Sequence, residues 1–107
     1  MNNINCIFIK INKSLKKVFL EDIVFVKAMG DYCTIQTKAS RHTVLSTMSN
    51  IESKLSKELF VRIHKSTIIQ IKEIQKIEGD IVHFNSKEWT KVSDSRMKEL
   101  KSRLTII

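Results

Sequence analysis

The side chains that could carry out catalysis or bind a metal are two cysteines and three histidines. Cys6 and Cys33 form neither a CxxC pair nor a Cys/His pair at the spacing of a zinc site. The histidines His42, His64 and His83 are scattered, and none has a second histidine four residues away on a predicted helix. With only two glycines, the chain also has no glycine-rich loop to hold a nucleotide phosphate. The sequence therefore predicts no catalytic centre, no metal site and no cofactor.

A different chemistry follows from the excess of basic side chains. The chain has 19 Lys and Arg residues against 11 Asp and Glu residues, so its formal net charge is +8. Such a charge attracts polyanions, which include DNA, RNA and acidic membrane surfaces. The excess is shared by both halves of the chain, so we expect a cationic folded surface and not a basic tail.

The length and composition predict one compact domain over residues 1–107. The chain is 42% hydrophobic, and this length can bury one core without disulfides or metal. No apolar run approaches the ~20 residues that span a bilayer, and the first residues lack the pattern of a signal peptide. Two unpaired thiols suit a reducing compartment. We therefore predict a cytoplasmic protein with no membrane partner.

Most of the chain is predicted to form strands, because 16 Ile and 7 Val stand against 2 Ala. Residues 23–28 are apolar on both faces, so we expect this strand at the centre of a sheet. Alternation and turn residues predict the following strands: 6–11, 15–20, 23–28, 32–37, 41–45, 60–63, 67–71, 74–78, 81–85 and 89–92.

Two helices are predicted where the apolar residues change period. Met48, Ile51, Leu55 and Leu59 recur at steps of three and four, which predicts a helix over residues 48–59, capped by Ser46 or Thr47. A second helix is predicted to begin after Ser93 and to turn Met97, Leu100 and Leu104 inward. We expect Trp89, in the strand before it, to be at least half-buried rather than a stacking platform.

Three stretches of the sequence carry a resemblance to a known family. They are residues 21–26 leading into Gly30, Asp31 and Tyr32; residues 60–74, with Arg62-Ile63-His64-Lys65-Ser66; and residues 92–96 before the last helix. In this order and spacing they resemble the LytTR DNA-binding domain, from about Phe8 to Leu104. The resemblance implies a mainly β fold, in which antiparallel sheets pack together with two short helices.

The resemblance also implies a function in bacterial transcription. Domains of this family are found in transcription regulators, often behind a receiver domain of a two-component, histidine-kinase pathway. Either this chain is a stand-alone regulator or it is a fragment of a longer response regulator. The resemblance implies binding to paired half-sites of double-stranded DNA, with a homodimer on the DNA as one arrangement. Loops between strands, and not a recognition helix, are expected to enter successive major grooves.

The resemblance places a first group of DNA contacts in residues 29–33. Here the chain offers Asp31, Tyr32 and Cys33. Asp31 is either an acceptor for a cytosine amino group or simply a turn former, and the sequence leaves both interpretations open. Lys65 and Ser66 match positions that meet the DNA backbone, which suits an ammonium and a hydroxyl group. His64 is interpreted as a structural hydrogen-bonding residue in preference to a base reader.

A second group of predicted contacts precedes and begins the last helix. Many relatives carry Arg or Lys where Ser95 stands, so we expect base reading to have moved to Arg96, whose guanidinium can bind guanine O6 and N7. The predicted members of this group are Lys91, Ser93, Ser95, Arg96 and Lys98.

Two other functions stay open at this point. A basic β module that binds RNA or ribosomes would need exposed aromatic side chains, and only Tyr32 is predicted at the edge of a loop. A protein-interaction adaptor would instead use the helix over residues 48–59 as a docking surface. Competition between duplex DNA and single-stranded RNA separates the first alternative, and a pull-down that recovers protein without DNA would favour the second.

Overall fold

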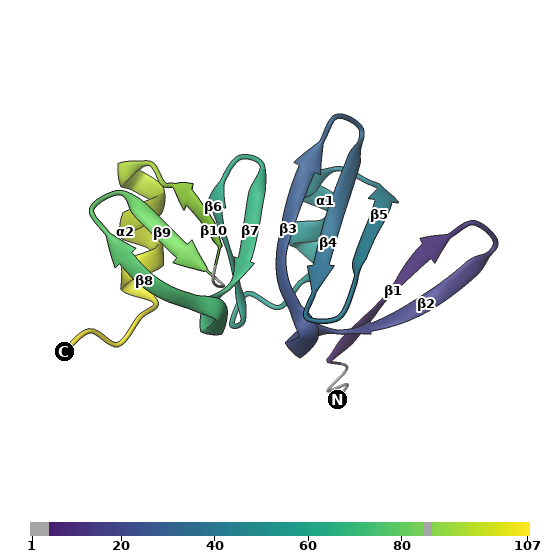
Figure 1. Ribbon diagram of the computed structural model, residues 1–107, viewed down its shortest axis with the longest axis horizontal. Helices are drawn as coiled ribbons and strands as arrows, with labels where there is room; N and C mark the ends of the chain where they lie inside the picture. Colours follow the sequence, from purple (N-terminus) through teal and green to yellow (C-terminus); the bar gives the residue numbers. More distant parts are fainter. Residues whose placement is uncertain (1–4, 85–86) are drawn as a thin grey trace.

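The computed structural model describes residues 5–84 and 87–107, which form three antiparallel sheets and two α-helices (Figure 1). The predicted mainly β fold with antiparallel sheets is confirmed. The strands are β1 (Cys6–Ile11), β2 (Ser14–Phe19), β3 (Ile23–Met29), β4 (Tyr32–Thr37), β5 (Arg41–Leu45), β6 (Phe60–His64), β7 (Thr67–Gln70), β8 (Ile74–Glu78), β9 (Ile81–Phe84) and β10 (Glu88–Lys91). The helices are α1 (Met48–Lys54) and α2 (Asp94–Ser102).

The largest sheet has five strands in the order β5-β4-β3-β7-β6, so β3 lies at its centre as predicted. All four side chains from Ile23 to Val26 are buried, which is why the sequence of this strand is apolar on both faces. The hairpin β1-β2 and the sheet β10-β9-β8 lie on either side of the central sheet (Figure 1).

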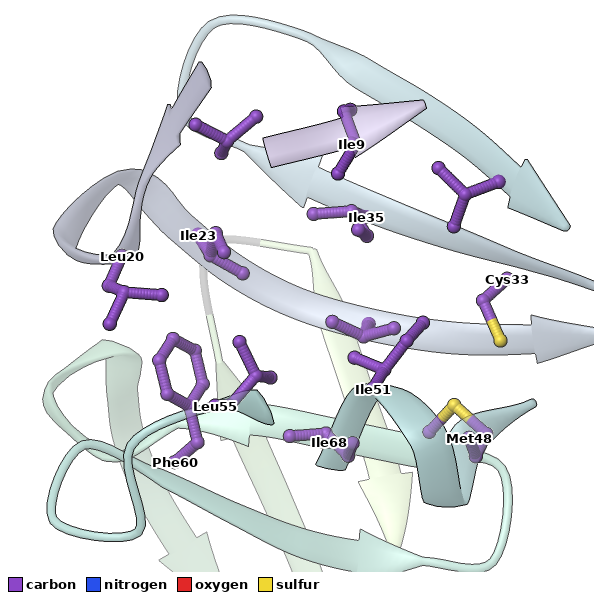
Figure 2. Close-up of a cluster of buried hydrophobic side chains, with 13 residues drawn as sticks. Ile9, Leu20, Ile23, Cys33, Ile35, Met48, Ile51, Leu55, Phe60 and Ile68 are labelled. Atoms are coloured by element: carbon purple, nitrogen blue, oxygen red, sulfur yellow. The ribbon is translucent and has the colours of Figure 1, made fainter. Parts of the chain in front are cut away.

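Two hydrophobic cores separate these layers. The first lies among β1, β2, the central sheet and α1, and Figure 2 shows it with Ile9, Ile23, Ile35, Ile51 and Phe60 pointing inward. The second lies among the central sheet, the sheet β8–β10 and α2, where Val82, Phe84 and Leu100 are completely buried. Both cores therefore use β3, β6 and β7, whereas β4 and β5 contribute buried side chains to the first core alone.

An irregularity in β3 changes which of its side chains face each core. The register with β4 shifts between Ile23 and Phe25, so strict alternation is interrupted there. Ile23 and Val26 pack in the first core, while Val24 and Phe25 pack in the second. The Phe25 ring meets the Phe84 ring edge to face, with centroids 5.5 Å apart.

The first helix is shorter than predicted. Thr47 caps it by accepting a hydrogen bond from the Asn50 N–H, but the helix ends at Lys54 and Leu55 is already extended. A new turn starts at Ser56, whose hydroxyl accepts from the Glu58 N–H. Leu59 therefore leaves the helical face and is 37% exposed. The predicted helix over residues 48–59 is wrong in its second half, because the polar Ser56 supplies a competing local hydrogen bond.

The C-terminal part differs from prediction at Trp89. This side chain is 60% exposed on β10, so the expectation of a half-buried residue is wrong. The three-stranded sheet packs only one face on the core, and the alternation of β10 turns Trp89 to the other face. Ser93 is the N-cap residue of α2 as expected, but its hydroxyl makes no capping hydrogen bond, and its carbonyl accepts the first bond of the helix from the Met97 N–H. The predicted end of β9 at Asn85 lies outside the described residues.

Candidate nucleic-acid interface

Three connections lie along one edge of the molecule, the upper edge in Figure 1. They are the turn between β3 and β4, the turn between β6 and β7, and the segment that joins β10 to α2. We call these segments, residues 29–32, 64–66 and 91–96, the tip surface. Eight of the ten predicted contact residues fall within it, Lys98 lies two residues further along α2, and the tenth, Cys33, is discussed below.

The first tip is a tight turn built on a glycine. Gly30 has a φ of +60°, a conformation that L-residues with side chains rarely adopt. Asp31 follows it and is exposed, and the Tyr32 ring is 49% exposed. Both side chains are therefore accessible to a large partner such as a duplex.

Cys33 does not share this exposure. Its side chain is 1% exposed, and the thiol donates to the Ser46 carbonyl over 3.3 Å. Burial raises the pKa of this thiol, and the nearby positive charge of Arg62 opposes the shift. The strand alternation that exposes Tyr32 sends the next side chain into the core, so Cys33 is not part of the surface that meets a partner.

The second tip is held by a histidine. The Nδ1 atom of His64 accepts the backbone N–H of Ser66 over 3.1 Å and lies 2.8 Å from the Ser66 hydroxyl. Since the backbone N–H can only donate, Nδ1 is the acceptor and the Ser66 hydroxyl donates to it. The predicted structural role of His64 is confirmed by these contacts, and Lys65 at the apex of the turn remains exposed.

The first two tips are joined through the backbone. The Ala28 N–H, at the end of β3, donates to the Ser66 carbonyl over 2.9 Å. This bond continues the pairing of β3 with β7, whose last register pair is Lys27 with Thr67. The glycine turn and the Lys65 turn consequently lie side by side at the end of two neighbouring strands.

Arg62 connects the second tip to the rest of the molecule. Its Nη1 atom donates to Glu52 Oε1 on α1 over 3.0 Å, and its Nη2 atom donates to the Lys65 carbonyl. The carbonyl of Arg62 itself accepts a bond of 3.1 Å from Nη1 of Arg96. One residue thus ties α1, the β6-β7 turn and the start of α2 together.

The third tip differs from prediction in the placement of Arg96. The guanidinium of this residue is partly buried against β6 through its bond to Arg62, so it does not extend freely into solvent. Ser93, Ser95 and Lys98 are exposed. Lys91 is exposed as well and lies 3.6 Å from the Asp80 carboxylate.

Sequence reasoning missed Arg62 and Glu52 as contributors to this surface. Arg62 stands two residues before His64 in the motif that carried the resemblance, where alternation places it on the same face of β6 as that histidine. A charged residue inside an otherwise apolar strand was the available signal. Its partner Glu52 is ten residues away on a helix, a pairing that no local pattern predicts.

Comparison with known proteins agrees with this architecture. The solved LytTr DNA-binding domain of a putative methyl-accepting/DNA response regulator from Bacillus cereus superposes with a TM-score of 0.79, covering 95% of this chain and 98% of that one, at 19% sequence identity. The likeness establishes the class of fold, an elongated arrangement of antiparallel sheets with two small helices.

Residues 13–105 match the LytTr DNA-binding domain family, and the chain belongs to this family of DNA-binding domains. It is 36% identical over 104 residues to the sensory transduction protein LytT of Bacillus cereus, a match that covers 90% of this chain and 41% of that protein. The LytT protein of Bacillus subtilis is 30% identical over 103 residues, covering 92% of this chain and 43% of that protein. A third relative, 30% identical over 94 residues, is the heme-containing CO-sensing transcriptional regulator RcoM 2 of Paraburkholderia xenovorans, with 82% of this chain and 35% of that protein covered.

The chain spans about two-fifths of the length of the LytT relatives. Within the described residues, neither helix is long and apolar enough to cross a membrane. In the same part of the chain, no three His, Cys, Asp or Glu side chains gather as metal ligands would.

Proposed function

We propose that this chain binds double-stranded DNA sequence-specifically, as the DNA-binding part of a bacterial transcription regulator, and that it does so through the tip surface. The observation that carries the proposal is the alignment of three connections along one edge (Figure 1). The first and second are joined by the bond from Ala28, at the end of β3, to Ser66. The third is joined to β6, the strand before the second, by the bond from Arg96 to Arg62. A rod-shaped duplex can meet all three segments at once only if they share an edge. Membership of a family of DNA-binding domains supports the same conclusion.

The tip surface divides into groups suited to phosphates and groups suited to bases. The ammonium of Lys65 and the hydroxyl groups of Ser93 and Ser95 match phosphate oxygens, while the N–H and hydroxyl of Ser66 already donate to His64 and hold the turn that presents Lys65. We assign Asp31 and Tyr32 to base edges in one groove, and Arg96 to base edges in the next. The guanidinium of Arg96 keeps further N–H donors after its bond to Arg62 and reads guanine with these.

Two copies of the chain are expected to occupy paired half-sites on one face of the DNA. Their centres would then be about 10 or 21 base pairs apart, which is one or two helical turns. Two of the relatives are named sensory transduction proteins, and the chain matches only part of each. We therefore place a signal-receiving unit, such as a receiver domain under a histidine kinase, upstream of this domain in the pathway.

The decisive experiment selects bound sequences from a random duplex library and then titrates the best site and a scrambled site at physiological salt. We expect a shared motif that repeats at one or two helical turns, with affinity at least about 10³-fold above the scrambled duplex. Equal affinity for both duplexes would exclude specific regulation. Single-stranded RNA that competes as well as the selected duplex would favour the RNA-binding alternative.

Removing the ammonium of Lys65 tests the assignment to phosphates. Lys65→Ala should weaken binding to the selected and the scrambled site alike and lower the salt slope by about one, because one phosphate contact is lost. The matched control is Lys72→Ala, in the segment after β7, at the opposite end of that strand from the tip surface, and it should leave the slope unchanged. Arg96→Ala should cost about 1 to 3 kcal/mol at one base pair and relax preference there. Identical behaviour of the Lys65 and Arg96 variants would contradict this division.

A further inference from the structure

A groove of about 670 Å³ lies between α1 and α2, next to the tip surface. Its lining includes Leu55, Phe60 and Ile68, which Figure 2 shows in the first core and which are at most 6% exposed, so each turns only a small apolar part toward the groove. The volume falls in the range of sites that bind small organic molecules. Of the residues proposed to contact DNA, only Ser95 and Arg96 line this groove.

The rim of the groove is cationic. Two carboxylates line it, those of Glu52 and Glu99, against four basic side chains, which are Lys57, Arg62, Arg96 and Arg103. Glu52 is already paired with Arg62 at 3.0 Å. Among the described residues, Arg96, Arg103 and Lys57 have no carboxylate partner within ion-pair distance. The groove thus combines the exposed parts of apolar side chains with the guanidinium groups of Arg96 and Arg103, which can pair with an acid.

We propose that this groove binds a small molecule with an acidic group, a carboxylate or a phosphate monoester, on an apolar body. The acid would pair with Arg96, in the first turn of α2, and with Arg103, which directly follows its last residue, and the apolar body would cover the exposed parts of Leu55 and Phe60. Because Arg96 also belongs to the tip surface, an occupant that pairs with its guanidinium withdraws it from DNA. The groove is therefore a regulatory site at which a small anion lowers DNA affinity, a consequence that rests on the proposed function.

Binding itself is tested without DNA, with phenyl phosphate and benzoate as probes and amide chemical shifts of the labelled protein as the measurement. Inorganic phosphate tests the need for an apolar body, and benzamide, which is neutral and shaped like benzoate, tests the need for charge. We expect saturable shifts confined to α1, β6 and α2 with the two aromatic acids, and at least about tenfold weaker binding of both controls. Equal binding of benzamide, or shifts spread over all basic surfaces, would overturn the proposal.

Two variants of α2 locate the acid. Arg103→Gln should weaken phenyl phosphate binding about tenfold, since it removes one charge-assisted contact. Lys101→Gln is its matched control, because this substitution removes one positive charge from the last turn of α2, and Lys101 does not line the groove. Glu99→Gln should tighten binding severalfold, an increase that damage to the fold does not produce. The site is wrong if Arg103→Gln and Lys101→Gln behave alike, or if Glu99→Gln weakens binding.

The coupling to DNA is a separate measurement on the selected duplex. Saturating phenyl phosphate should weaken DNA binding at least about fivefold in the unaltered protein, the lower end of typical coupling between sites. Arg103→Gln should raise the probe concentration needed for this effect about tenfold while binding DNA, without probe, as Lys101→Gln does. If Arg103→Gln lowers DNA affinity below that of Lys101→Gln, the groove is part of the DNA interface and not a regulatory site. Failure of specific DNA binding would leave the probe measurements standing, so the two proposals fail separately.

Discussion

The two layers that cover the central sheet are attached to it in different ways. The hairpin β1-β2 buries Ile9 and Val18 but leaves Phe8 59% exposed and Leu15 67% exposed. Among the described residues, no side-chain hydrogen bond or ion pair joins this hairpin to the central sheet. The opposite layer buries Val82, Phe84 and Leu100 completely. It is also tied by polar contacts, from Lys27 to Glu88 at 3.0 Å and from Arg96 to Arg62.

This difference shows which side of the molecule sets the geometry of the tip surface. The third tip is carried by β10 and α2, so its position relative to the other tips depends on the tightly packed layer. The hairpin supplies none of the tip residues. We therefore expect changes in the β8–β10 layer to disturb DNA binding, and changes on the outer face of the hairpin to leave it intact.

The largest effect on stability is expected from a cavity in the second core. Phe84→Ala should lower the free energy of unfolding by about 3–5 kcal/mol, because the ring is fully buried and packs on Phe25. The same truncation in the hairpin, Phe8→Ala, should cost less than about 1 kcal/mol. Urea denaturation of both variants measures the contrast. Equal losses would mean that the two layers are attached with similar strength.

A smaller effect on stability, but a clear effect on DNA, is expected from Arg62. Arg62→Met removes the bonds to Glu52 and to the Lys65 carbonyl, so affinity for the selected duplex should fall about tenfold or more. The salt slope should stay unchanged, since Arg62 is assigned no phosphate. The amide signals of Lys65 and Ser66 should shift as the turn loosens. Arg41→Met, an exposed arginine on β5, is the control, and equal effects of the two changes would remove Arg62 from its positioning role.

The first core contains a group that makes stability depend on pH. Burial raises the pKa of Cys33, so the unfolded chain loses this proton at a lower pH than the folded chain does. The contribution is present below the ordinary thiol value of 9.0 and is lost as pH rises through the higher folded pKa. Cys33→Ala should therefore show a smaller loss of stability in alkaline solution than Cys6→Ala, whose thiol is only partly buried. Parallel pH profiles of the two variants would contradict the assignment.

The smallest effect is expected at Trp89. Because 60% of its surface is exposed, Trp89→Ala should change the free energy of unfolding by no more than about 0.5 kcal/mol, despite the size of the ring. Tryptophan fluorescence should accordingly be solvent-quenched and red-shifted in the folded protein. A loss of several kcal/mol would contradict the exposed position of this side chain.

The positions of the strands could be predicted from the sequence, but the burial of some side chains could not. Period-two alternation located all ten strands to within two residues, because most of them have one buried and one exposed face or, like β3, are apolar throughout. Apolar spacing failed at Leu59, where Ser56 ended the helix, and at Trp89, where a large ring lies on the open face of a three-stranded sheet. Hydrophobicity alone does not say which face of a strand finds a covering layer.

The candidate site was less predictable than the strands. Family resemblance placed Lys65, Ser66 and the start of α2 in the sequence, but only three-dimensional packing brings them to one edge. The burial of Cys33 and the bond from Arg96 to Arg62 depend on contacts across 13 and 34 residues of chain, which local patterns do not encode.

The irregular strand β3 has a consequence for how the molecule opens. Since Ile23 and Val26 belong to one core and Val24 and Phe25 to the other, β3 loses its native packing completely only when both cores open. The amide protons of this strand should exchange with deuterium only through global opening, and those of the hairpin through local fluctuations. The amide protons of β3 would then be the slowest in the protein to exchange. The first tip, which follows this strand, would be attached to the most stable part of the fold.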